Sequence, residues 1–352
     1  MLKKAAALFL VCASTVIGIS CGSTSSHFLY AAIPGSNQIA AYREDPNSGI
    51  LTQLTGSPIS AGQAVQSIVI HPSKKFLYAA NSGEGDVALY TISTAGVLTE
   101  SPPRTPVGTA PTLLAMDSAG AFLYVGNSGS FNISVFSISA STGLLTPVGS
   151  PFPIGLSPIS MTLSPSGGFL YVTGQVQNTG IIEAFAVTQG VPTIVANSPF
   201  TTGNAPYGLT IAPGGGFLYT ANLLDNSISE FPINADGSLG LANIIGEQYS
   251  GPNALLIDKS GKYMYVANQG STNLAAYSIG SDGGLTLLTT SPFGTAASPN
   301  VVASDSAGKY LFVGNQKSPV IQSFNLASST GVLTSVSTYS VAGAPTSIAI
   351  TP

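Results

Sequence analysis

The chain has 352 residues, of which 44% are hydrophobic and only 7% are charged, and its formal net charge is −4. Soluble proteins average roughly 25% charged residues, so few side chains are available here for acid–base chemistry. Arg43 and Arg104 are the only arginines and there is no basic patch, which excludes nucleic acid as a partner.

The first predicted element is an export signal at residues 1–20. Lys3 and Lys4 precede an apolar stretch that is short for a membrane-spanning helix. The following Cys21 and the polar GSTSS resemble the end of a bacterial lipoprotein signal, which implies a lipidated Cys21 and a short linker at 21–26. This predicts an exported protein anchored at the cell envelope. A conventional signal peptide, cut near the same place to release a soluble secreted protein, is the alternative.

Cleavage at this position removes Lys3, Lys4 and Cys12 from the mature chain. The remaining 8 basic and 14 acidic residues give a net charge of 8 − 14 = −6. The mature chain then has one cysteine, Cys21, and cannot form an intrachain disulfide. No later segment is long and apolar enough to span a membrane, so the lipid anchor is the only membrane contact that we expect.

Seven copies of an aromatic strand signature follow the signal. They read HFLYAA at 27–32, KFLYAAN at 75–81, AFLYVGN at 121–127, GFLYVTG at 168–174, GFLYTAN at 216–222, KYMYVAN at 262–268 and KYLFVGN at 309–315. The spacings between their first aromatic residues are 48, 46, 47, 48, 46 and 47 residues. A period of this length is typical of four-stranded propeller blades.

Each repeat contains four strand-like runs separated by turn residues. In the second repeat these runs are QSIVI, FLYAA, VALYTI and VLTE, with the alternating β-branched and aromatic residues of sheets. The chain begins with a second strand and ends with a first strand. We therefore predict that Ser347–Thr351 pairs with Phe28–Ile33 and closes the ring. The fold class is all-β: one seven-bladed propeller of four-stranded blades, occupying residues 27–352.

This pattern of period, signature and blade count resembles the seven-bladed lactonase family. That family includes 6-phosphogluconolactonase-like enzymes, and the related YVTN-repeat propellers occur in bacterial surface proteins. Catalytic members carry a motif of the form GPRH…HP.G…YV.NE. The resemblance implies that its Arg and His enter a central funnel at the start of an inner strand, and that its Glu follows the next strand.

The sixth repeat aligns with this motif but differs at its chemical positions. Gly251 and Pro252 match, whereas Asn253 stands in place of the Arg, Ala254 in place of the His and Gln269 in place of the Glu. Lactone hydrolysis needs a base that activates water and donors for the developing oxyanion. The blade therefore keeps the frame of the motif without an obvious base.

The same topology predicts an uncharged funnel. Its candidate binding residues are Gln66, Tyr207, Asn253, Gln269, Asn300 and Gln316. The ring of Tyr207 either stacks on a sugar or peptide or fills the central channel, and the sequence does not distinguish these roles. A charged cluster from Glu183, Glu230 or Asp225 would favour enzymatic chemistry instead.

No metal site and no cofactor are predicted. The two histidines, His27 and His71, are far apart in sequence, and His71 lies in the HPSKK turn, where we expect a solvated side chain. His27 precedes the first strand and is expected near the anchor.

These patterns lead to two functional hypotheses. The first is a monomeric envelope-bound binding or scaffold module, whose funnel takes a neutral small molecule, a glycan or an envelope protein. The second is a lactone hydrolase with a degenerate or relocated site, similar to 6-phosphogluconolactonase. The lack of Arg and Lys in the predicted funnel argues against a phosphorylated sugar and favours the first hypothesis.

Overall fold

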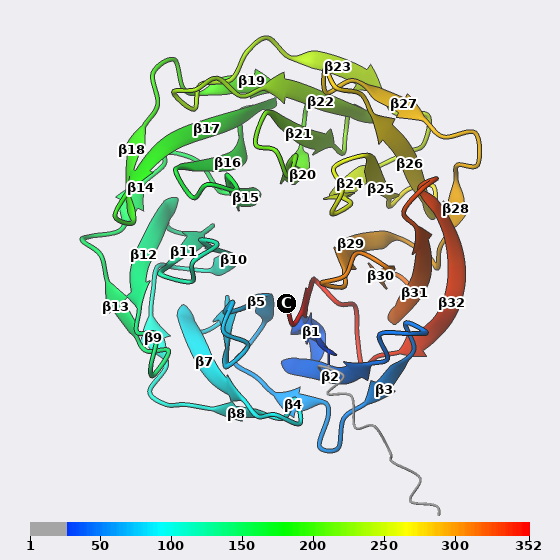
Figure 1. Cartoon of the computed structure of the whole chain (residues 1–352). Coiled ribbons are helices and arrows are strands. Elements are labelled where there is room, and N and C mark those ends of the chain that lie inside the picture. Colours follow the sequence, from blue (N-terminus) through cyan, green and yellow to red (C-terminus); the bar gives the residue numbers. More distant parts are fainter. Residues whose placement is uncertain (1–26) are drawn as a thin grey trace, which may run out of the picture.

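The computed structural model describes residues 27–352, which form a ring of seven β-sheets around a central channel (Figure 1). The chain runs once around the ring, and the first and last strands meet in one sheet. The seven-bladed all-β fold predicted from the repeats is therefore confirmed. Cys21, the signal at 1–20 and the linker at 21–26 lie outside the described residues.

The innermost strands surround the channel and contact one another from blade to blade. From the first blade to the seventh they are β33 (Ser347–Ile350), β5 (Val65–Ile70), β10 (Pro111–Met116), β15 (Ser160–Leu163), β20 (Pro206–Ile211), β24 (Pro252–Ile257) and β29 (Pro299–Ser304). The second strands carry the aromatic signature and are β1 (His27–Ile33), β6 (Phe76–Asn81), β11 (Phe122–Asn127), β16 (Phe169–Val176), β21 (Phe217–Asn222), β25 (Tyr263–Asn268) and β30 (Tyr310–Asn315).

The outer half of each blade follows in chain order. The third strands are β2 (Gln38–Glu44), β7 (Asp86–Ile92), β12 (Asn132–Ile138), β17 (Thr179–Thr188), β22 (Ser227–Pro232), β26 (Asn273–Ile279) and β31 (Val320–Ala327). The fourth strands are β3 (Leu51–Gln53), β8 (Leu98–Glu100), β13 (Leu145–Pro147), β18 (Val191–Ile194), β23 (Asn243–Gly246), β27 (Leu285–Leu287) and β32 (Val332–Ser340).

Five blades also have a short fifth strand that the sequence analysis did not predict. These strands pair with the third strand of their blade and are β4 (Ile59–Ser60), β9 (Thr105–Pro106), β14 (Phe152–Pro153), β19 (Phe200–Thr202) and β28 (Phe293–Gly294). They contain or adjoin proline, which removes a backbone donor and is tolerated at a sheet edge. Among the described residues, the only helix is the 3-10 turn η1 (Pro34–Ser36), and none is long and apolar enough to cross a membrane.

The ring closes as the repeat pattern predicts. Strand β33 pairs antiparallel with β1, with Leu29 opposite Ile350 and Ala32 opposite Ser347. The strand itself ends at Ile350, but Thr351 continues the pairing: its Oγ1 accepts a hydrogen bond from the backbone N–H of Phe28 at 2.9 Å. The first and last strands of the described residues are thus paired with each other, which covers edges that would otherwise be open.

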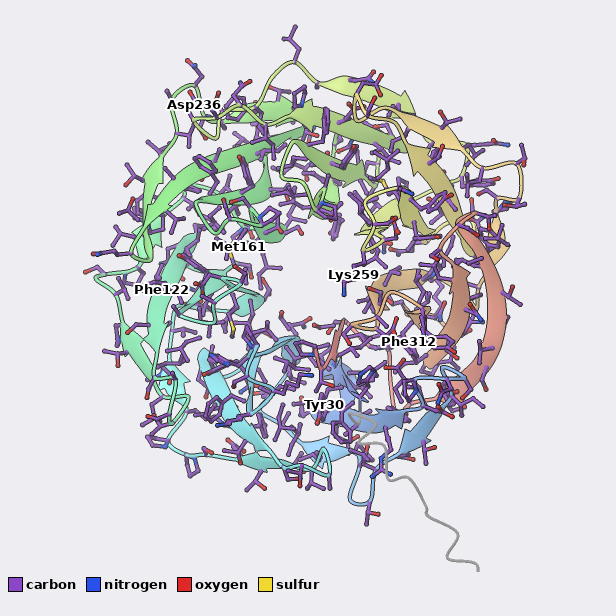
Figure 2. All side chains as sticks on the ribbon, viewed as in Figure 1. Tyr30, Phe122, Met161, Asp236, Lys259 and Phe312 are labelled. Carbon is purple, nitrogen blue, oxygen red and sulfur yellow. The ribbon has the colours of Figure 1, made fainter. Side chains whose placement is uncertain are left out.

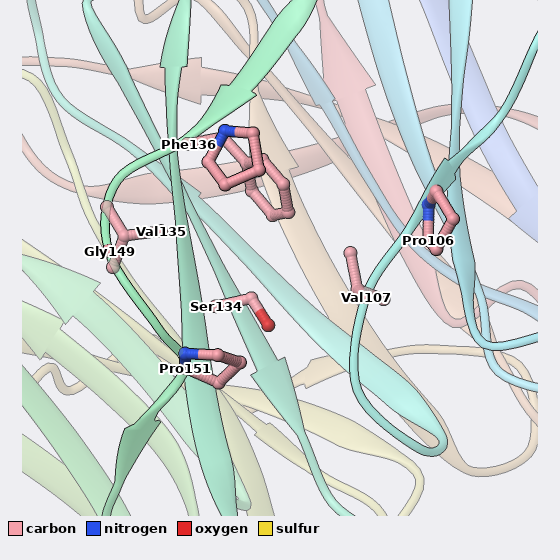
Figure 3. Close-up of a pocket in the computed structure, with 8 residues that line it drawn as sticks. Pro106, Val107, Ser134, Val135, Phe136, Gly149 and Pro151 are labelled. Atoms are coloured by element: carbon pink, nitrogen blue, oxygen red, sulfur yellow. The ribbon is translucent and has the colours of Figure 1, made fainter.

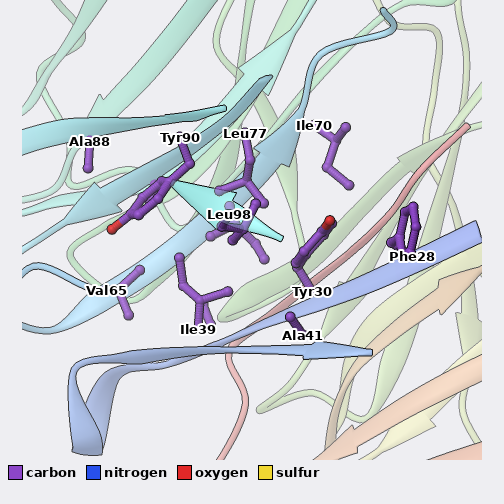
Figure 4. Packing of buried hydrophobic residues seen from close by; sticks show 13 residues of the cluster. Phe28, Tyr30, Ile39, Ala41, Val65, Ile70, Leu77, Ala88, Tyr90 and Leu98 are labelled. Carbon is purple, nitrogen blue, oxygen red and sulfur yellow. The ribbon is translucent and has the colours of Figure 1, made fainter. Parts of the chain in front are cut away.

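The core lies between neighbouring blades rather than in one central mass. Between the first two blades, Tyr30, Ile39, Leu77 and Tyr90 are fully buried and pack together (Figure 4). Equivalent clusters occur at the other blade contacts described by the structure. Each blade therefore depends on its neighbours for burial of its apolar faces.

The signature tyrosines also connect blades through hydrogen bonds. The hydroxyl of Tyr78 donates to the carbonyl of Gly143 in the next blade at 2.6 Å, and Tyr219 does the same to Gly283 at 2.7 Å. Tyr124 occupies the equivalent position in the third blade, yet its buried hydroxyl has no hydrogen-bond partner. In the seventh blade the position is Phe312.

This difference gives a matched pair of variants. We expect Tyr78→Phe to lower the free energy of unfolding by about 1 kcal/mol, because it leaves the Gly143 carbonyl without its donor. Tyr124→Phe removes a hydroxyl that makes no bond, and we expect no loss of stability. Chemical denaturation of both variants checks this, and equal losses would contradict the role assigned to the hydrogen bond.

Candidate functional site

A cavity of about 430 Å³ opens at one end of the channel, on the face where the first strands begin and the second strands end. Its polar lining comprises Gln66, Thr112, Ser160, Tyr207, Asn253, Gln269, Asn300, Gln316 and Thr346. The structure thus brings together all six predicted funnel residues and also places Ala254 in the wall. That these residues bind a ligand stays a prediction.

A β-bulge positions five of these side chains. At the start of the first strand in five blades, the pairing with the second strand shifts by one residue. The residues at the shift are Gln66, Thr112, Tyr207, Asn253 and Asn300. A bulge leaves one residue outside the regular ladder and redirects its side chain, which explains why all five line the cavity.

The residue two positions before each bulged residue has a positive φ. These residues are Ala64 (54°), Ala110 (50°), Ala205 (54°), Gly251 (70°) and Ser298 (65°). This left-handed conformation is uncommon for residues other than glycine. Its recurrence indicates that the turn into the first strand is built in the same way around the ring.

A chain of carboxamides crosses the wall between the sixth and seventh blades. Asn253 Nδ2 donates to Gln269 Oε1 at 2.8 Å, and Gln269 Nε2 donates to Gln316 Oε1 at 3.2 Å. Asn300 Nδ2 donates to the carbonyl oxygen of Pro345 at 2.7 Å. The Oδ1 atoms of Asn253 and Asn300 are buried and accept no hydrogen bond, so the wall has unused acceptors.

Tyr207 is the aromatic residue in the lining of the cavity. This residue is 51% exposed, so it is not packed as a plug of the channel. Its ring is accessible to a ligand, as stacking on a sugar requires. The apolar part of the lining includes Leu113, Leu209 and Leu255. The sequence analysis did not select these residues because they resemble ordinary inner-strand residues.

Within residues 27–352, no Asp, Glu, His, Lys or Arg lines this cavity. Glu183 and Glu230 lie in third strands, away from it, and Asp225 bonds to the backbone N–H and Nδ2 of Asn204 at 2.8 and 2.9 Å. The charged cluster that would favour enzymatic chemistry is therefore not formed by these residues. Burial raises the pKa of Glu183 to about 7, but this carboxyl does not face the cavity.

Two lysines that follow a first or a second blade strand do not line the cavity either. Lys317 follows Gln316 at the cavity face, but it is exposed and does not line the cavity. Lys259 projects toward the central opening in the view of Figure 2, yet it belongs to the turn after β24, at the opposite end of that strand from Asn253. Its Nζ donates to the carbonyl of Ser306 at 2.9 Å.

A second cavity, of about 180 Å³, lies between the second and third blades (Figure 3). It is lined by Val107, Ser134, Phe136 and several prolines. Its lining, as far as the described residues form it, has no Asp, Glu, His, Lys, Arg, Tyr or Cys side chain for acid–base chemistry. The larger funnel cavity, with its converging polar groups, is therefore the candidate site.

The expectation of a solvated His71 is wrong. His71 is only 5% exposed, its Nδ1 lies 2.8 Å from Ser73 Oγ, and its Nε2 lies 3.0 Å from the carbonyl oxygen of Gly120. The turn of the next blade covers it, which a reading of its own turn does not reveal. His71 remains remote from the cavity lining.

Comparison with known proteins places this architecture among lactonases. The family model described as "Lactonase, 7-bladed beta-propeller" matches residues 25–157, 154–255 and 245–350. The 6-phosphogluconolactonase of Blochmanniella pennsylvanica is 33% identical over 117 residues, which are 33% of this chain and 34% of the relative. That of Cronobacter sakazakii is 34% identical over 112 residues, 32% of each chain. The chain thus matches about a third of the length of these curated relatives.

Solved structures agree in fold. A putative 6-phosphogluconolactonase from Bacteroides fragilis has a TM-score of 0.82 at 19% identity, with 94% of this chain and 99% of that chain covered. The periplasmic gluconolactonase PpgL of Pseudomonas aeruginosa has a TM-score of 0.79 at 19% identity, with 93% and 99% covered. At this identity the likeness shows the shared propeller alone.

Proposed function

Because this chain belongs to the lactonase family of seven-bladed β-propellers, we propose that it uses the family's funnel to bind a neutral, hydroxyl-rich ligand such as a sugar or glycan. The observation that carries this proposal is the lining of the cavity, in which carboxamides, hydroxyls and one half-exposed tyrosine occur without an acid, a base or a histidine.

The cavity chemistry suits such a ligand in two ways. Carboxamides both donate and accept hydrogen bonds, as sugar hydroxyls do, and Tyr207 offers a ring face for stacking. A phosphorylated sugar would need compensating positive charge, for which Arg and Lys are the usual residues. Lys317, which follows the lining residue Gln316 in the sequence, does not itself line the cavity.

Hydrolysis of an unphosphorylated sugar lactone is the second candidate. It is favoured by the family membership and by the relatives named 6-phosphogluconolactonase. The reaction would need a base, and the lining residues described by the structure include no carboxylate, imidazole or amine to supply one. We therefore place binding before hydrolysis.

The proposal includes an envelope location. Export through the signal at 1–20 and anchoring at Cys21 would present the funnel to extracytoplasmic glycans or envelope proteins. Replacement of Cys21 by Ser, followed by membrane fractionation and mass spectrometry of the lipid, tests the anchor separately from the funnel.

The decisive experiment measures lactone hydrolysis and ligand binding on the same preparation. We expect hydrolysis of 6-phosphogluconolactone and gluconolactone to proceed at the spontaneous rate. Calorimetric titration against a panel of neutral sugars and glycans is expected to find a ligand whose affinity falls at least tenfold in Tyr207→Ala and Asn253→Ala. The chain has no tryptophan, so calorimetry is preferable to intrinsic fluorescence.

A variant at Leu241, which is 94% exposed on the outer rim, serves as the matched control. Leu241→Ser should bind as the unmodified protein does. Hydrolysis clearly above the spontaneous rate that is lost in the Tyr207 or Asn253 variants would overturn the binding proposal in favour of the lactonase.

A further inference from the structure

Three potential metal ligands meet where the first and seventh blades join, on the face opposite the funnel. His27 begins β1 and lies directly across from Glu44, which ends β2. Asp305 follows β29 in the seventh blade. One nitrogen or oxygen atom from each of these three side chains lies within 4.8 Å of the others. The residues are 8%, 1% and 3% exposed, so the cluster is almost sealed from solvent.

The carboxylates of this cluster have unused oxygens. Asp305 Oδ1 accepts the backbone N–H groups of Lys309 and Tyr310 at 2.7 and 2.8 Å, but its Oδ2 is buried without a hydrogen-bond donor. Both oxygens of Glu44 are likewise buried without a donor. The Nδ1 atom of His27 lies 3.7 Å from Glu44 Oε2. Burying a carboxylate without hydrogen-bond donors lowers the stability of the fold unless a cation compensates its charge.

Glu44 also departs from the repeat. In the other six blades the equivalent residue near the end of the third strand donates its N–H to the carbonyl oxygen of the first residue of the signature, which precedes the first aromatic. These equivalent residues are Ile92, Ile138, Val187, Ile233, Ile279 and Leu326. A carboxylate has thus replaced an aliphatic side chain in one blade only, and it has done so beside a histidine and an aspartate.

We infer that His27, Glu44 and Asp305 bind one divalent transition-metal ion, with zinc as the best match to this donor set. Zinc takes one imidazole nitrogen and carboxylate oxygens at about 2.0–2.2 Å, distances that modest side-chain rotation from the present cluster provides. The ion's two positive charges balance the two carboxylates when the histidine is neutral. Zinc would hold the first and seventh blades together across the point of ring closure.

Zinc titration of the full chain, purified in mild detergent and stripped with a chelator, tests this site. Calorimetry is expected to give one zinc ion per chain, and zinc should raise the thermal unfolding temperature until chelator is added. Glu44→Ile restores the residue type of the other blades and is expected to fold. Loss of a supporting group at a zinc site weakens metal binding roughly 10–100-fold, and we expect Glu44→Ile to weaken zinc binding by at least this much. His27→Gln should do the same.

Asp258 provides the matched control. Its Oδ1 accepts the N–H groups of Lys262 and Tyr263 as Asp305 does in the next blade, but its Oδ2 is bonded within its own turn to Ser260. Asp258→Asn should therefore keep zinc affinity, whereas Asp305→Asn should lose it. Absence of zinc binding by the unmodified chain overturns the inference. Zinc binding that is unchanged in Glu44→Ile and His27→Gln also overturns the inference. If that binding is lost in Cys21→Ser, zinc binds at Cys21 and the inference is overturned as well.

Discussion

Replacing Gly237 by alanine is expected to lower the free energy of unfolding by about 2–5 kcal/mol. Gly237 has a φ of 82°, a conformation that costs a residue with a Cβ roughly 1–2 kcal/mol. A Cβ at this position would overlap the ring of Phe169, the first aromatic of the signature in the preceding blade. Overpacking of a well-filled site adds about 1–3 kcal/mol.

A large effect is expected because this glycine–aromatic contact recurs between neighbouring blades all around the ring. In each blade the turn between the third and fourth strands presents a positive-φ glycine to the signature aromatic of the blade before it. These glycine–aromatic pairs are Gly96 with Phe28, Gly143 with Phe76, Gly190 with Phe122, Gly237 with Phe169, Gly283 with Phe217, Gly331 with Tyr263 and Gly49 with Tyr310. The last pair closes the ring between the seventh and first blades.

Gly56→Ala separates backbone strain from steric overlap. Gly56 has nearly the same φ, 83°, but a Cβ there would have no neighbour within 4 Å. We expect this control to lose only about 1 kcal/mol. Denaturant unfolding of the two variants measures the difference. Similar losses would mean that the aromatic contact contributes little and that the conformation alone requires glycine.

The sequence was sufficient to predict the ring because its signal is repeated seven times. The aromatic signature marks a buried second strand, and each repeat adds the same evidence for a blade. Closure by Ser347–Thr351 could be predicted because the first repeat begins with a second strand and the last repeat ends with a first strand. The short fifth strands could not, because segments such as Ile59–Ser60 are too brief for a strand pattern.

The position of the candidate site could be predicted from the sequence, but the backbone geometry that directs its side chains into the cavity could not. Gln66, Tyr207, Asn253 and Asn300 were selected because they open inner strands, whereas the bulge that turns them into the cavity depends on pairing with the second strand. The burial of Glu44 could not be predicted from the sequence for a related reason. In sequence it lies in a polar run, Arg43 to Asp45, that is typical of a solvated turn, and only the first and seventh blades together enclose it.

The proposed function predicts that chemistry can be added to the funnel. The triple variant Asn253→Arg, Ala254→His and Gln269→Glu gives the sixth blade the residues of the catalytic family motif. Asn253 Nδ2 already lies 2.8 Å from Gln269 Oε1, so an Arg and a Glu at these positions can form a pair. The histidine and the carboxylate supply candidate bases, and the guanidinium can stabilise an oxyanion.

We expect this variant to hydrolyse a sugar lactone roughly 100-fold faster than the unmodified protein, at the low end of the gain typical of general acid–base catalysis. The single variant Asn253→Arg, which adds the cation without a base, should remain at the spontaneous rate. Denaturation curves must first show that the triple variant is folded, since charges are being added to a partly buried wall. A folded triple variant without activity would mean that the funnel lacks more of the catalytic frame than these three side chains, and so has diverged toward binding in its shape as well as in its chemistry.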